Sequence, residues 1–316
     1  MKSTREKHKI ELHNSHDNYG VQIRILENPK SALIEKFLFK IAKQWIAGNT
    51  MEQALKSARE ANKNGMAAII NRLGEHVASK SQIDETESEY ITLISNLRKS
   101  QVFGGISIKP TQVGLVKNAK DCQKSLHKII EKAATSQSFV WIDMESSEYT
   151  DNTISVYRDL FETYERIGIA IQANLKRSNQ DLDAILENGG KIRLVKGAYR
   201  ETNRIAFKTR HEVDENYKKL MKKLFLNGNE FAIATHDSSL IELAIEFSKE
   251  HEKKFEFQML KGIRDELKLI LIKDGFSVSE YIPYGTNWLP YSIRRLKERK
   301  RNILLLGSSF LQSHRV

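Results

Sequence analysis

Cations, acids and aromatic side chains stand at the ends of several short apolar segments, where a parallel barrel places the residues that carry its chemistry. Residues 191–199, Lys-Ile-Arg-Leu-Val-Lys-Gly-Ala-Tyr, are the clearest case, because glycines flank the apolar run. Such a run predicts a short buried strand. Active sites of barrel enzymes lie at the carboxyl ends of the strands. The candidate site residues of this segment are therefore Arg193, Lys196, Gly197 and Tyr199.

The same arrangement recurs along the rest of the chain. We predict strands at 66–70, 106–108, 139–142, 167–171, 192–195, 231–234, 255–260 and 281–284. The residues at their ends that could act in a site are Lys109, Asp143, Met144, Glu145, Gln172, Asn174, Thr235, His236, Asp237, Gln258, Leu260, Tyr281 and Tyr284. If the strands close into a barrel, all of these side chains are expected to face one mouth.

A basic segment near the carboxyl end adds a candidate anion site. Residues 291–298 have the spacing of a helix, on which Glu298 lies four residues after Arg294 and three after Arg295. Glu298 can therefore pair with either arginine on one face. Because arginine offers a planar fork of donors that fits a carboxylate, the two arginines could bind an acidic substrate.

Taken alone, these residues leave several chemistries open. Asp143 and Asp237 could be the paired acids of a hydrolase. Lys109 or Lys196 could form a Schiff base, since a desolvated lysine inside a barrel is a nucleophile. His236 could be a base or a satisfied core histidine, and we expect no metal site because no second histidine stands at ligand spacing.

The order of the elements predicts an α/β barrel. Helical periodicity at 182–186, 217–226, 240–247 and 267–272 alternates with the predicted strands, which indicates parallel strands joined by crossover helices. About eight strands are the number that closes a TIM-type (βα)8 barrel. An open doubly wound sheet is the alternative, but no glycine-rich dinucleotide fingerprint follows any strand.

Three regions of the sequence differ in polarity and periodicity. Residues 1–30 are expected to be a poorly ordered polar arm, and 31–100 a helical N-terminal segment that includes a possible first barrel strand near 66–70. In that segment, Thr50 and Gln53 form a capping-box pattern before a helix. Residues 101–316 are expected to be the remainder of the barrel, with the site.

Composition narrows the class of protein. The 316 residues contain one cysteine, Cys122, and carry a formal net charge of +11. A single cysteine forms no internal disulfide and fits a reducing compartment. No secretory signal or membrane-spanning run is evident, and no nucleic-acid-binding motif accompanies the basic charge. We expect a cytoplasmic protein that does not bind nucleic acid.

Seven motifs, in chain order and one per strand end, resemble the proline dehydrogenase family, especially its monofunctional bacterial type, over about residues 37–310. They are Ile-Ser-Ile-Lys109, Ile-Asp-Met-Glu145, Ile-Gln-Ala173, Arg-Leu-Val-Lys-Gly-Ala-Tyr199, Ala-Thr-His-Asp237, Phe-Glu-Phe-Gln-Met-Leu260 with Gly262, and Tyr-Ile-Pro-Tyr-Gly285 followed by Tyr291 and Arg294-Arg295.

This resemblance implies a distorted (βα)8 barrel with a small N-terminal helical part, bound FAD, and oxidation of L-proline to Δ1-pyrroline-5-carboxylate. Hydride would pass to flavin N5, and electrons would then pass to a membrane quinone. Scattered Lys and Arg residues would assist peripheral contact with the anionic inner face of the membrane. The chain has no room for an aldehyde dehydrogenase, so a separate pyrroline-5-carboxylate dehydrogenase is the implied partner.

The resemblance also implies roles for individual residues. Lys109, Arg294 and Arg295 would bind the proline carboxylate, while Leu260, Tyr281 and Tyr199 would enclose the ring. Arg193 would lie near flavin N5, and Asp143 would orient a cation or a tyrosine hydroxyl. The other cofactor contacts would be Met144, Gln172, Lys196, Gly197, Ala198, Thr235, His236 and Glu298.

Two further functions stay open. A related flavoenzyme could oxidise a modified proline, such as hydroxyproline or an N-methylated form, although Tyr281 pressing on the ring favours unsubstituted proline. A barrel that has lost catalysis could serve as a binding module, but the retention of Lys109, Arg193, Tyr281 and both arginines argues against that.

Overall fold

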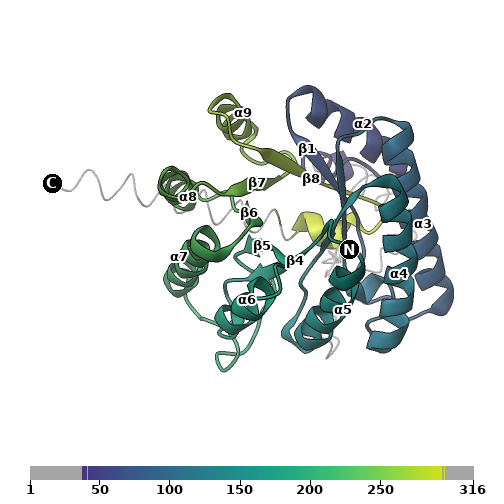
Figure 1. Cartoon of the computed structure of the whole chain (residues 1–316). Helices are drawn as coiled ribbons and strands as arrows, with labels where there is room; N and C mark the ends of the chain where they lie inside the picture. Colours follow the sequence, from purple (N-terminus) through teal and green to yellow (C-terminus); the bar gives the residue numbers. More distant parts are fainter. Residues whose placement is uncertain (1–37, 41, 294, 296–316) are drawn as a thin grey trace, which may run out of the picture. The chain divides into compact units, whose positions relative to one another are not determined.

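The computed structural model describes residues 38–40, 42–293 and 295 (Figure 1). The chain divides into two compact units, one formed by Gln44–Trp288 and the other by Met1–Lys43 with Leu289–Val316. The expected polar arm, Arg294 and Glu298 lie outside the described residues, and the boundaries proposed for the three sequence regions stay predictions.

Eight parallel strands of the first unit form a closed barrel in chain order, each paired with the next and the last with the first. The prediction of a (βα)8 barrel is therefore confirmed. The strands are β1 (Ala67–Arg72), β2 (Gly104–Ile108), β3 (Phe139–Ile142), β4 (Ile167–Gln172), β5 (Lys191–Val195), β6 (Glu230–Ala234), β7 (Lys254–Leu260) and β8 (Val278–Tyr284).

A helix precedes β1, a helix joins each pair of successive strands, and the helices lie outside the ring of strands in Figure 1. They are α2 (Met51–Lys63), α3 (Lys80–Lys99), α4 (Ala119–Ser136), α5 (Thr150–Thr163), α6 (Ser178–Leu186), α7 (Arg210–Asn227), α8 (Ser238–Glu250) and α9 (Asp265–Lys273), with short 3-10 turns at Pro110–Gln112 and Ser147–Tyr149. Thr50 and Gln53 form the predicted capping box at the start of α2. In the described part of the chain, no helix is both long and apolar enough to cross a bilayer.

Side chains of each strand alternate between the barrel interior and the helices outside it. Phe231, Phe255 and Phe257 face outward and pack with Phe225 of α7 in a cluster of aromatic rings. Ile69, Trp141 and Ala232 form a separate cluster with Phe139 and Tyr281. The barrel therefore has an outer apolar layer and a smaller interior filling.

One glycine makes room for the interior filling. Gly168 of β4 pairs with Trp141 of β3, and a Cβ at Gly168 would come within 2.3 Å of the indole ring. A larger residue there would displace Trp141, because a packed interior has no free volume to take the added atom.

The expectation that every strand-end residue faces the mouth is wrong for Tyr284. Its hydroxyl donates to Glu89 of α3, at 2.8 Å, on the outer side of the sheet. Tyr281 and Tyr284 are three positions apart, and an odd spacing in a strand places the two side chains on opposite faces.

Candidate active site

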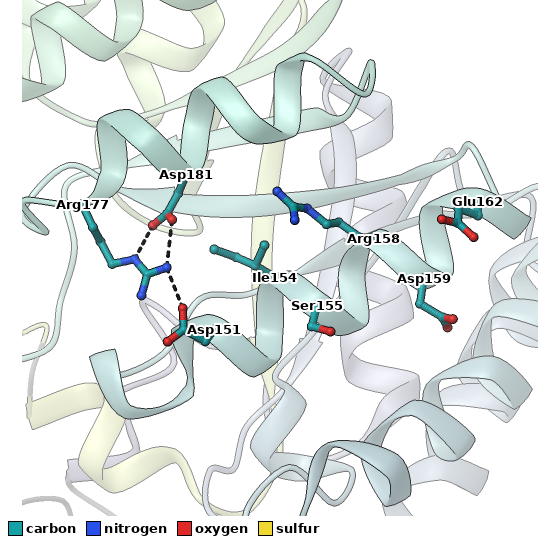
Figure 2. A pocket seen from close by; sticks show the side chains of 8 residues that line it. All are labelled: Asp151, Ile154, Ser155, Arg158, Asp159, Glu162, Arg177 and Asp181. Carbon is teal, nitrogen blue, oxygen red and sulfur yellow. Dashed lines mark hydrogen bonds and ion pairs between the residues drawn. The ribbon is translucent and has the colours of Figure 1, made fainter.

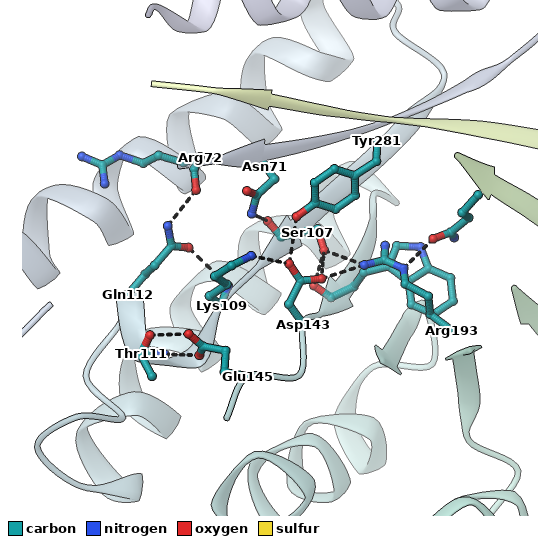
Figure 3. A network of polar contacts seen from close by, with 12 residues as sticks. Asn71, Arg72, Ser107, Lys109, Thr111, Gln112, Asp143, Glu145, Arg193 and Tyr281 are labelled. Atoms are coloured by element: carbon teal, nitrogen blue, oxygen red, sulfur yellow. Dashed lines mark hydrogen bonds and ion pairs between the residues drawn. The ribbon is translucent and has the colours of Figure 1, made fainter. Parts of the chain in front are cut away.

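Asp143, the first residue after β3, is the centre of a buried polar network (Figure 3). Its Oδ2 accepts from the Lys109 ammonium and from the Tyr281 hydroxyl, each at 2.8 Å. Its Oδ1 accepts from the Arg193 guanidinium and from the Ser107 hydroxyl, each at 2.7 Å. One carboxylate thus joins residues from four regions of the chain that the barrel brings together.

Strand geometry explains this convergence. Ser107 and Lys109 are two positions apart at the end of β2, so both side chains point to the interior. The Asp143 amide donates to the Ile108 carbonyl at 2.9 Å, which continues the pairing of β2 with β3 by one residue. Arg193 lies within β5 and Tyr281 within β8, so their side chains approach Asp143 from across the barrel.

Arg193 is fixed from several directions, and only 3% of the residue is exposed. Its Nη1 donates to Ser107 and Asp143, and its Nε donates to Gln258 of β7. Its guanidinium also lies over the rings of Trp141 and Tyr281, at 4.6 and 5.6 Å from their centroids. Such contacts hold the positive charge in one place and orientation.

The electrostatics of the network keep its groups in defined protonation states. Burial alone would raise the pKa of Asp143, but the charges of Lys109 and Arg193 lower it to about 2. Burial alone would lower the pKa of Lys109, but Asp143 raises it well above its usual value. Burial, and then Asp143, raises the pKa of Tyr281 well above its usual range.

These protonation states carry a chemical consequence. At neutral pH Lys109 and Arg193 bring two positive charges against the one negative charge of Asp143, so the three side chains together attract an anion. They also argue against Lys109 as the lysine of a Schiff base, and against Asp143 and Asp237 as the paired acids of a hydrolase. A nucleophilic lysine needs a depressed pKa, which Lys109 lacks. Asp237 bonds to Lys196, Ser239 and Arg210, which lower its pKa against the effect of burial, so neither it nor Asp143 is suited to donate a proton.

Residues expected to contact a cofactor lie at the ends of β4, β5 and β6. Gln172 is buried and donates to the Glu145 carbonyl at 2.8 Å. Lys196 forms ion pairs with Asp214 and Asp237, at 2.5 and 2.9 Å. The His236 Nε2 accepts from the Leu260 amide at 2.9 Å, which joins the ends of β6 and β7.

Gly197 adopts a left-handed backbone with φ of +99°, and a Cβ there would come within 2.0 Å of the Asn174 side chain. The position therefore accepts only glycine without rearrangement. The remaining predicted residues lie as follows: Ala198 is exposed, Thr235 is buried and accepts from the Asp237 amide, Met144 packs in the outer apolar core, and Tyr199 and Leu260 are half-buried.

The predicted arginine pair belongs to the second unit. Arg295 is half-buried and its guanidinium lies 5.4 Å from the Tyr291 ring centroid, while Arg294 and Glu298 lie outside the described residues. The roles of all three stay predictions from the motif.

Several polar residues of the network were not predicted. Ser107 and Trp141 lie two positions before Lys109 and Asp143, so the alternation of the strands could have indicated both. Glu256 accepts from Gln258 and Ser279, each at 2.5 Å, beneath Arg193, and burial raises its pKa. Glu256 lies two positions before the predicted Gln258, so the alternation of β7 could have indicated it, whereas Ser279 of β8 is brought to Glu256 only by the closed barrel.

A surface hollow of about 420 Å³ lies away from this network, between α5 and α6 (Figure 2). Arg177 bonds there with Asp151 and Asp181. None of the predicted site residues lines it.

Comparison with known proteins finds proline dehydrogenases by family model and by sequence. The family model described as proline dehydrogenase matches residues 54–304. Proline dehydrogenase 2 of Bacillus subtilis strain 168 is 36% identical over 279 residues, which cover 84% of this chain and 92% of that protein. The proline dehydrogenase of Deinococcus radiodurans is 31% identical over 299 residues, covering 92% and 96%.

A solved structure supports the fold. Proline utilization A (PutA) of Bdellovibrio bacteriovorus, inactivated by N-propargylglycine, superposes with a TM-score of 0.77 at 24% identity, covering 84% of this chain and 33% of that chain. The chain thus spans about a third of the length of that protein.

The family model matches residues that include every strand of the barrel, and the two relatives each cover more than four fifths of the chain. The chain therefore belongs to the proline dehydrogenase family of oxidoreductases that act on proline.

Proposed function

We propose that the chain oxidises L-proline to Δ1-pyrroline-5-carboxylate with FAD as its bound redox cofactor. The observation that carries the proposal is the Asp143 network, which fixes Lys109, Arg193 and Tyr281 at the carboxyl ends of the strands, in a chain of this family. The net positive charge of this network suits a substrate that carries a carboxylate.

The residues present fit a flavin. Arg193 Nη2 is buried and has no hydrogen-bond partner among the described residues, although the other two guanidinium nitrogens are bonded. A buried donor of this kind is costly unless a bound group accepts from it. The absence of a Cβ at Gly197 makes room for the Asn174 side chain, and the left-handed backbone there turns the chain at the end of β5. Gln172, Lys196, Thr235 and His236 are the further side chains proposed to hold the cofactor.

When bound, FAD would take up the two electrons and the hydrogen that leave the substrate carbon. The protein supplies position and electrostatic field. Lys109 binds the carboxylate, and the roles of Arg294 and Arg295 stay predictions from the motif. Tyr281 and Leu260 lie against the ring, and Arg193 supplies a fixed positive charge that stabilises developing negative charge. Asp143 orients these groups and does not take the amine proton, since its pKa is about 2.

The electrons are proposed to pass to a membrane quinone, which requires contact with a membrane surface. The net charge of +11 favours an anionic surface. The product is proposed to pass to a separate pyrroline-5-carboxylate dehydrogenase.

The test is the near-ultraviolet and visible absorbance spectrum of the purified protein, before and after anaerobic addition of L-proline. Oxidised-flavin bands that bleach with proline are the expected result. A flavin spectrum that proline leaves unchanged but N-methylproline or hydroxyproline bleaches would move the assignment to a modified proline. A protein that stays colourless after addition of FAD would contradict the proposal and favour a binding module.

A further inference from the structure

Glu145 is a second carboxylate at the end of β3, two residues after Asp143, and it is fully buried. Its Oε2 accepts from the Thr111 amide at 3.0 Å and its Oε1 accepts from the Thr111 hydroxyl at 2.5 Å. Thr111 is itself fully buried and stands two residues after Lys109. The end of β3 therefore holds the Lys109 segment at two points, the ammonium through Asp143 and the backbone through Glu145 (Figure 3).

Thr111 also forms hydrogen bonds with the loop that follows β1. The His76 amide donates to the Thr111 hydroxyl oxygen and the Val77 amide donates to the Thr111 carbonyl, each at 3.0 Å. Because the hydroxyl oxygen accepts from His76, its own proton is directed to Glu145. An ionised Glu145 accepts from both Thr111 donors with its two oxygens, whereas a protonated one carries a proton of its own on one of them.

We propose that Glu145 is a positioning residue that sets the place of the Lys109 ammonium, and hence the affinity for the substrate carboxylate. This inference rests on the proposed function in taking Lys109 as a carboxylate-binding group. Glu145 acts only through Thr111 and the turn Pro110–Gln112, and its carboxylate has both oxygens engaged by Thr111.

Because Glu145 can be protonated, this role predicts a pH dependence of the KM for proline. Burial raises the pKa of Glu145 to about 7, against the opposing effects of Thr111 and Lys109. Among the described residues, Glu75 raises that pKa further, the buried thiol of Cys122 is also close, and the His76 backbone bonds to Thr111. A protonated carboxyl donates to the Thr111 oxygen and leaves the hydroxyl proton without its acceptor. The KM for proline should therefore fall as pH rises through about 7.

The kinetic test compares E145A, E145Q and T111V with the unchanged protein, with rates expressed per bound flavin. E145A and T111V should each raise the KM for proline about tenfold while kcat changes much less, because substrate binding is lost rather than chemistry. Most of the effect of T111V on the KM should be absent when it is added to E145A, because E145A already removes the contact from the Thr111 hydroxyl to Glu145. E145Q, which imitates the protonated acid, should remove the dependence of KM on pH around 7.

The matched control is E280Q. Glu280 is a buried carboxylate on the outer face of β8 that pairs with Lys268. Its loss should lower stability and leave the KM and its pH profile unchanged. An unchanged KM in both E145A and T111V, or a pH profile of KM that E145Q shares with the unchanged protein, would overturn the proposal.

A readout that needs no activity separates this inference from the proposed function. The Cys122 thiol contacts the Pro110 carbonyl at 3.6 Å and is buried, so release of the segment should speed its reaction with a thiol reagent. E145A should accelerate labelling and E280Q should not. If the unchanged protein fails to oxidise proline, the proposed function fails, whereas equal labelling rates in E145A and the unchanged protein would count against the role of Glu145.

Discussion

Asp143 accepts from four side chains, of which two are cations, and it does so in a place almost closed to water. Removing a partner from such a network leaves the remaining charges buried and unbalanced, which costs more than the loss of a surface pair. Asp143 is therefore a structural requirement for the position of Lys109 and Arg193, beyond any contact with a ligand.

The substitution Asp143→Asn should lower both activity and stability. It removes the negative charge between Lys109 and Arg193, so the two cations repel each other and Arg193 loses its charged acceptor. We expect kcat/KM for proline to fall about 100-fold, and the free energy of unfolding in urea to fall by about 3 kcal/mol, as for a broken buried pair.

Asp183→Asn is the control for that experiment. Asp183 pairs with Lys223 on the surface, and such pairs contribute about 1 kcal/mol or less. If Asp143→Asn lowers the free energy of unfolding no more than Asp183→Asn does, the buried charge of Asp143 is not needed to balance Lys109 and Arg193.

Glu145 gives the protein a pH dependence of known sign. Its folded-state pKa of about 7 is raised above the ordinary value of about 4.3 for a free glutamate. Its contribution to stability is therefore fully present below about pH 4.3 and is lost as pH rises through about 7, with a slope of up to about 1.4 kcal/mol per pH unit. The ionised Glu145 thus holds the Lys109 segment in place but lowers the free energy of unfolding. Such a loss of stability is common at functional sites.

The measurement is the free energy of unfolding of E145Q minus that of the unchanged protein, taken at several pH values. The difference should grow with pH between about 4.3 and 7 and then level off. Because all other groups titrate in both proteins, a difference that is flat with pH would contradict the raised pKa.

At the scale of elements, the loop between β5 and α7 is tied to its neighbours by polar contacts. The Glu201 carboxylate accepts from the amide and the hydroxyl of Ser147, at 2.8 and 2.7 Å, in the loop after β3. The Lys176 amide donates to the Ile205 carbonyl at 2.9 Å. This loop includes Tyr199, which is predicted to enclose the proline ring. The contacts that fix the loop should therefore also fix the position of Tyr199.

The substitution Glu201→Ala should release this loop from the end of β3. Trypsin should then cut faster after Arg200 and Arg204, because cleavage requires local opening of the backbone. Glu215→Ala, which removes an exposed pair with Lys218 on α7, should leave those cleavage rates unchanged. Equal rates in both variants would mean that Glu201 does not hold the loop.

The elements could be predicted from the sequence to within a few residues, and the network only in part. Buried parallel strands have continuous apolar runs, so all eight were located, but β8 begins at Val278 instead of Tyr281, because Ser279 and Glu280 interrupt its apolar pattern. Ser279 and Glu280 are polar for tertiary reasons: Ser279 bonds to Glu256 inside the barrel, and Glu280 pairs with Lys268 outside it. Lys109, Asp143 and Tyr281 were found from their motifs, whereas Glu145 was noted as a strand-end residue without a role.

At the scale of the whole molecule, the charge of +11 gives a prediction for the proposed membrane contact. The protein should sediment with liposomes that contain anionic lipid at low salt and detach at high salt, because surface charge is screened within about 10 Å at 0.1 M salt. Liposomes of neutral lipid are the control. Absence of binding to anionic liposomes at low salt would remove the membrane from the proposal.

The pairing of β1 with β8 has a consequence for how the chain is made. Ile69 pairs with Tyr281, so the barrel can close only after almost all of its residues have left the ribosome. Until then β1 and the most recently made strand have unpaired edges, which are templates for association with other chains. Slow translation should therefore lengthen the period in which the nascent protein depends on chaperones, and Tyr281, which completes the Asp143 network, arrives last.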